Sequence, residues 1–104
     1  MFDALEVAHQ IVRAVARLID AVVRCDPDLA RQMRKSTSSI PLNVAEGRRR
    51  AGKDRPHHYR IASGSADELV SQLRVALDWG YIADASEPLA LLDRELAMLW
   101  RLTH

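Results

Sequence analysis

Residues Asp3 to Cys25 read DALEVAHQIVRAVARLIDAVVRC, and the spacing of their apolar side chains decides the fold class. Apolar residues recur at intervals of three and four, which is the repeat of an α-helix with a buried face. They form two adjacent seams: Leu5, Ala8, Val12, Val15, Ile19 and Val22 in one, and Ala4, Val7, Ile11, Ala14, Leu18, Ala21 and Cys25 in the other. We therefore predict one continuous helix over residues 3–25.

The double seam also bears on self-association. A helix that is apolar over most of its circumference must be covered on two sides. The core of a small helical domain covers one side, and a second subunit can cover the other. The alternative is a central helix in a tightly packed monomer.

A second helix is predicted to start at Asp26-Pro27-Asp28, because proline suits the first helical turn and acidic side chains face the positive helix end. Its apolar positions are Leu29, Met33, Ile40 and Val44. Pro41 lies inside this segment and removes one backbone hydrogen bond. We expect a bend at Pro41 in one long helix, and the alternative is a break with a short helix on either side.

Two further helices complete the pattern. One is predicted over about residues 55–80 and ends at Gly80, and the other starts near Ser86, a candidate cap. Gly64 lies inside the third helix, where glycine costs up to about 1 kcal/mol relative to alanine, so we expect another helix to approach closely there. The predicted fold is all-α, an up-and-down four-helix bundle with its second helix bent at Pro41, forming a single domain over residues 1–104.

Composition narrows the class of protein. Cys25 is the only cysteine, so no intrachain disulfide can form. The first residues carry Asp3 and Glu6 where a secretory signal needs positive charge. No run of about 18 uncharged apolar residues occurs, so we expect no membrane-spanning helix. A soluble, cytoplasmic protein is the expectation.

The charges are strongly segregated along the chain. Residues 31–60 contain nine basic side chains and two acidic ones, a net charge of +7. The rest of the chain contains six basic and twelve acidic side chains, a net charge of −6. A positive region of this kind attracts polyanions, and arginine suits bidentate phosphate contact.

The segment SIPLNVAEGRRR, residues 39–50, places three arginines at the end of the second helix. The candidate nucleic-acid-binding residues are Arg48, Arg49, Arg50, Lys53 and Arg55, supported by Arg34, Lys35 and Arg60. Only Tyr59 among aromatic residues falls in this region, so we expect contact with phosphate backbone rather than base stacking. Two alternatives stay open: the basic ridge docks a subunit or another protein, or the arginines are solvated and complement the negative helix end.

Catalytic and metal-binding patterns are absent from the sequence, and we expect neither an enzyme nor a cofactor. His57 and His58 are adjacent, so on a helix they diverge by about 100° and do not share a metal in the i, i+4 manner. Asn43 and Glu46 lie three residues apart on one helix face. Beside Arg48 and Arg49, these two residues are candidates for a polar network between helices.

Two motifs in order carry a family resemblance. Residues 39–47 read SIPLNVAEG and residues 61–69 read IASGSADEL. Together they resemble the bacterial four-helix bundle protein family, whose members include proteins encoded in intervening sequences of large-subunit ribosomal RNA genes. The accessory variability determinant of diversity-generating retroelements is a relative. The resemblance spans almost the whole chain.

What the resemblance implies is an up-and-down four-helix bundle that assembles as a ring-like homopentamer. It also implies a nonenzymatic role, with binding of nucleic acid and of a reverse transcriptase attributed to the retroelement branch. The leading hypothesis is thus an oligomer that contacts the phosphate backbone of RNA or DNA through residues 31–60. The alternative is an oligomeric scaffold whose basic ridge docks a protein partner such as a reverse transcriptase.

Overall fold

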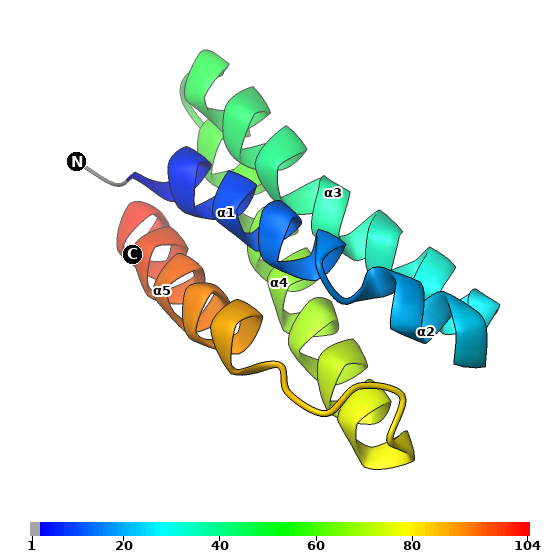
Figure 1. Cartoon of the computed structure of the whole chain (residues 1–104). Coiled ribbons are helices and arrows are strands. Elements are labelled where there is room, and N and C mark those ends of the chain that lie inside the picture. The colour runs from blue at the N-terminus through cyan, green and yellow to red at the C-terminus, as the bar shows by residue number, and fades with distance from the viewer. Residues whose placement is uncertain (1–2) are drawn as a thin grey trace.

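The computed structural model describes residues 3–104, and this part of the chain is helical with short connections and no strand (Figure 1). The predicted all-α class is confirmed. The helices are α1 (Ala4–Ala16), α2 (Ile19–Cys25), α3 (Pro27–Arg49), α4 (Asp54–Trp79) and α5 (Ser86–Thr103). Residues 3–104 therefore contain five helices, not the four that the sequence predicts.

The extra helix arises because the predicted first helix divides in two. The amide of Leu18 donates to the carbonyl of Val15 at 3.0 Å, and the amide of Ala21 donates to Leu18 at 3.2 Å. These bonds span three residues instead of four, so the backbone tightens and α2 leaves the line of α1 (Figure 1). The new direction lets Ile19 and Val22 be buried where α2 packs on α3. A continuous helix over residues 3–25 is wrong.

Helix α3 is continuous through Pro41. The Asp26 carboxylate caps its start by accepting a hydrogen bond from the amide of Leu29 at 3.0 Å, and Pro27 occupies the first turn, as the sequence predicts. The alternative of two short helices separated at Pro41 is wrong. The bend itself stays a prediction.

The third and fourth predicted helices are confirmed within a residue as α4 and α5. Gly80 ends α4 in the left-handed conformation, with φ of 78°. Ser86 is not a cap: it is the first residue of α5, and its own amide donates to the carboxylate of Asp84 at 2.9 Å. Helix α5 returns along α4 and α1 (Figure 1).

Most of the double seam is buried within the single chain. The fully covered seam residues of α1 and α2 are Ala4, Val7, Ala8, Ile11, Ala14, Val15, Ile19 and Val22. All of these except Ala4 and Ala14 pack with Met33, Ile40, Leu69, Leu73 and Leu92. Leu5, Val12 and Leu18 remain half-buried. The helices of the same chain thus cover most of the apolar surface that we expected a second subunit to cover.

The close helix approach occurs at a different glycine from the one predicted. A side chain on Gly64 would meet nothing within 4 Å, so no other helix of residues 3–104 crosses there. Gly47 is buried in α3 against Tyr59 of α4. This contact fixes how α3 and α4 meet at the end of the molecule that carries the arginines.

Candidate nucleic-acid interface

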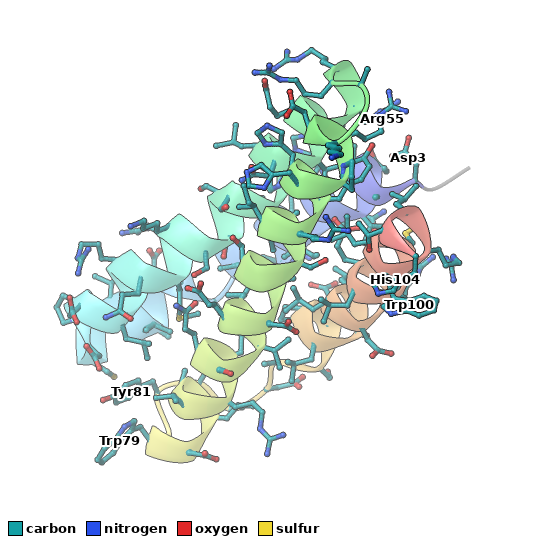
Figure 2. The ribbon with its side chains drawn as sticks, turned by 180° about the vertical axis from the view of Figure 1, so that it is seen from behind. Asp3, Arg55, Trp79, Tyr81, Trp100 and His104 are labelled. Carbon is teal, nitrogen blue, oxygen red and sulfur yellow. The ribbon has the colours of Figure 1, made fainter. Side chains whose placement is uncertain are left out.

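Five basic side chains gather around the connection between α3 and α4. Arg48 and Arg49 form the last turn of α3, Arg50 and Lys53 belong to the connection, and Arg55 lies in the first turn of α4. All five are exposed. We call these five residues the basic ridge. Figure 2 shows Arg55 at one end of the long molecule and Trp79 at the other.

Arg55 holds the carboxyl end of α3. Its Nε donates to the carbonyls of Gly47 at 3.2 Å and Arg50 at 3.0 Å, and Nη2 donates to the carbonyl of Arg48 at 3.3 Å. The last carbonyls of a helix have no partners within the helix and carry partial negative charge. Arg55 is therefore a helix cap supplied from the next helix, a role that sequence spacing did not reveal.

The three consecutive arginines each contact a carboxylate. Arg48 Nη1 lies 3.3 Å from Asp3 Oδ2, while Arg49 and Arg50 both bind Glu46, at 2.6 and 2.7 Å. Hydrogen bonds from Arg49, and then from Arg50, lower the pKa of Glu46 to about 2. These are exposed ion pairs, which are weak and screened by salt, so a polyanion can compete for the guanidinium groups.

Lys53 differs from the arginines because no partner within residues 3–104 contacts its ammonium. It lies beside Gly52, whose φ of 62° turns the chain between the two helices. Arg60, farther along α4, is also exposed without a partner in the described chain. Lys53 and Arg60 can therefore contact a ligand without first breaking an ion pair within the described chain.

Arg34 and Lys35 lie apart from the ridge and on different sides of α3. Thirteen residues separate Lys35 from Arg48, which is about 20 Å along a helix. Arg34 borders a small hollow of about 130 Å³ with Val12 and Ile19, whereas Lys35 lines a groove between α3 and α4. The two supporting residues therefore do not join one surface.

The predicted polar network around Asn43 and Glu46 forms only in part. Asn43 does connect two helices: its Oδ1 lies 3.2 Å from Nδ1 of His58 on α4, and its amide nitrogen donates to the carbonyl of Ser39. Glu46 instead pairs within its own end of α3. Tyr59 is buried, 5% exposed, and offers no stacking surface.

The Asn43 contact continues into a polar groove between α3 and α4. Ser65 donates to Ser39 at 2.8 Å, and Ser36 donates to Glu68 at 3.5 Å. The groove has a volume of about 380 Å³ and is lined by Arg31, Gln32, Lys35, Ser36, Ser39, Ser65, Glu68 and Gln72. Several of these residues belong to the two sequence motifs, but their convergence needs the antiparallel pairing of α3 and α4.

Other kinds of site find little support in the described chain. Within residues 3–104, no three histidine, cysteine or acidic side chains are grouped so as to hold a metal ion. Nor does this part of the chain contain a helix with the length and apolarity needed to cross a membrane.

Comparison with known proteins identifies a family. The family model described as 23S rRNA-intervening sequence protein matches residues 2–101, nearly the whole chain. No curated protein matches the chain.

Proposed function

The chain belongs to the 23S rRNA-intervening sequence protein family, and we propose that it is a nonenzymatic, oligomeric protein that binds the phosphate backbone of nucleic acid. The basic ridge would make the primary contacts. In this proposal α1 and α2 together count as the first helix of an up-and-down four-helix bundle. The protein acts in the cytoplasm.

The observation that carries the proposal is the gathering of the basic ridge at one end of the molecule. Within residues 3–104, the exposed guanidinium groups of Arg48 to Arg50 contact the carboxylates of Asp3 and Glu46, and Lys53 has no partner. Each phosphate that such cations neutralise releases condensed counterions. The burial of Tyr59 supports backbone contact over base stacking.

Self-association is the second part of the proposal. Large apolar side chains are exposed on three helices: Leu42, Ile61, Val75, Trp79, Trp100 and Leu102. Exposed apolar side chains gain free energy when they are buried between subunits. A homopentamer is the assembly that the family resemblance implies. A mass in solution equal to one chain would overturn it.

Docking of a protein partner, such as a reverse transcriptase, is the second candidate function. The contacts of Arg48 with Asp3 and of Arg49 with Glu46 support it, because they place arginine beside carboxylate groups at this surface. An acidic partner surface could replace these carboxylates. Such an interface should survive competition by generic DNA, whereas polyanion binding should not.

Salt dependence tests the leading proposal. Labelled duplex DNA and structured RNA are titrated at about 50 and 200 mM salt, where several phosphate contacts should change affinity by orders of magnitude. The test variant changes Arg48, Arg49 and Arg50 to glutamine. Glutamine removes the charges without repelling Asp3 and Glu46, and we expect it to abolish most of the binding.

A matched control changes Arg13, Arg17 and Arg24 to glutamine. These exposed arginines lie on α1, α2 and the turn between them, and Arg13 and Arg17 also contact carboxylates. The control therefore removes the same charge far from the ridge, and we expect it to retain most of the affinity. Equal losses in both variants would show that only net charge matters, and no binding by the wild type at low salt would overturn the proposal.

A further inference from the structure

The groove between α3 and α4 is lined by two cations from α3 and by a carboxylate and an amide from α4. The cations are Lys35 and Arg31, both exposed, and Arg31 also pairs with Asp28 at 2.7 Å. Glu68 and Gln72, one turn apart on α4, line the same groove. The two helices diverge away from the Arg55 end of the molecule, and the groove lies in this wider part (Figure 2).

Two acceptors in the groove lack a close hydrogen-bond donor within residues 3–104. The Glu68 carboxylate is exposed, and within residues 3–104 it accepts a single, long hydrogen bond of 3.5 Å, from the hydroxyl of Ser36. Oε1 of Gln72 is buried and has no hydrogen-bond partner in the described chain. A buried acceptor without a donor costs free energy that a ligand with a hydroxyl group would recover.

A carboxylate beside two cations is an unusual lining for a surface that binds only phosphate. A negative group repels the phosphates of DNA and RNA alike, and the DNA backbone has no hydroxyl to donate in compensation. The backbone of RNA presents a 2′-hydroxyl, a hydrogen-bond donor, next to every internal phosphate. An RNA backbone can place a phosphate against Lys35 and Arg31 and donate a hydrogen bond from a 2′-hydroxyl to Glu68. Both the cations and the carboxylate of the groove then have a partner.

We propose that the α3–α4 groove binds the sugar–phosphate backbone of RNA, with Glu68 accepting a hydrogen bond from a 2′-hydroxyl and Lys35 and Arg31 contacting phosphate. This inference rests on the proposed function and adds a preference for RNA over DNA. The groove and the basic ridge lie on the same pair of helices, about 20 Å apart along α3. One strand of several nucleotides can therefore contact both.

Three probes of one base sequence isolate the 2′-hydroxyl. Each is a single strand of about 16 nucleotides, near the upper end of common site sizes. The first is RNA, the second is DNA with deoxyuridine in place of thymidine, and the third is RNA with 2′-O-methyl groups. The methylated probe keeps an oxygen on the sugar but cannot donate a hydrogen bond. Wild-type protein should bind the RNA about tenfold more tightly than either of the other probes, as expected for one charge-assisted hydrogen bond.

Glu68→Ala should bring the three affinities together, because it removes the acceptor that distinguishes the probes, while the repulsion of phosphate that it also removes is common to all three. Asp67→Ala is the matched control: it removes the same charge from the neighbouring exposed position, which does not line the groove. This control should keep the preference for RNA.

Each outcome separates the two proposals. Equal binding of all three probes by the wild type, or a preference that Glu68→Ala leaves intact, overturns the groove while nucleic-acid binding by the ridge stands. Failure of every probe to bind at low salt overturns the proposed function, and the groove with it. A loss of preference in both Glu68→Ala and Asp67→Ala assigns the effect to net charge and also overturns the groove.

Discussion

The ring of Tyr59 on α4 lies directly against the backbone of Gly47 on α3. A Cβ atom at Gly47 would lie 2.7 Å from Cε1 and 2.9 Å from Cδ1 of the ring, and 3.3 Å from the carbonyl oxygen of Arg55. Real Cβ atoms essentially never lie within 3.0 Å of another atom, so the ring would have to shift to admit one. Glycine at position 47 therefore allows the ring this close contact, which joins the two helices beside the basic ridge.

Gly47→Ala should destabilise the fold. The added methyl group must displace the buried Tyr59 ring or separate α3 from α4, and overpacking of this kind costs about 1–3 kcal/mol. Urea unfolding followed by circular dichroism measures the change in the free energy of unfolding. A variant as stable as the wild type would show that Tyr59 is free to move.

Gly64→Ala is the matched substitution on the outer face of α4. The new side chain meets nothing within 4 Å, so only helix propensity acts, and stability should rise by up to about 1 kcal/mol. The same urea experiment measures it at several protein concentrations. A loss of stability that grows with concentration would instead show that another copy packs on Gly64.

Gly47 and Gly64 illustrate which features of the fold the sequence could predict: the helices themselves, but not where two helices touch. Periodicity predicted α3, α4 and α5, because each buries a regular apolar stripe. It could not distinguish Gly47 from Gly64, since which glycine meets another helix depends on the pairing of α3 with α4. Nor did it predict the turn at Leu18, where the apolar spacing continues although the backbone changes direction.

For the candidate site, the sequence predicted that basic residues gather in one region, but it did not predict what each of these residues contacts. The charge count located the basic ridge, because Arg48 to Arg55 are close in the chain. The capping role of Arg55 depends on three carbonyl positions, and the separation of Arg34 from Lys35 depends on which neighbours flank α3. Neither can be read from composition.

Glu95 makes stability depend on pH. It is fully buried on α5, and neither carboxylate oxygen has a hydrogen-bond partner in the described chain. Burial, with a smaller effect from the negative charge of Asp3, raises its pKa from 4.5 to about 8. Between about pH 5 and 8 the unfolded chain loses this proton and the folded chain keeps it. The free energy of unfolding should therefore fall as pH rises, by up to about 1.4 kcal/mol per pH unit, and level off above about pH 8.

Glu95→Gln tests this origin of the pH dependence. Glutamine has nearly the same shape and stays neutral, so the slope between pH 5 and 8 should flatten and stability at pH 8 should exceed that of the wild type. Thermal or urea unfolding at intervals across this range measures the slope. The pKa values of Asp3, Asp28, Glu46 and Asp84 are lowered, so these carboxylates change the free energy of unfolding at lower pH than Glu95 does. A slope unchanged in the variant would assign it to other groups.

Lys53→Gln and Arg55→Gln should separate nucleic-acid binding from stability within the basic ridge. Each removes one positive charge from positions two residues apart. Lys53 has no partner in the described chain, so its loss should reduce the salt slope of binding by about 0.9 and change stability by less than about 0.5 kcal/mol. The Arg55 guanidinium already donates to the carbonyls of Gly47, Arg48 and Arg50. Its loss should lower the free energy of unfolding by about 1–2 kcal/mol and alter the salt slope less than the Lys53 variant does. Equal slopes in the two variants would mean that Arg55 leaves the helix end to bind phosphate.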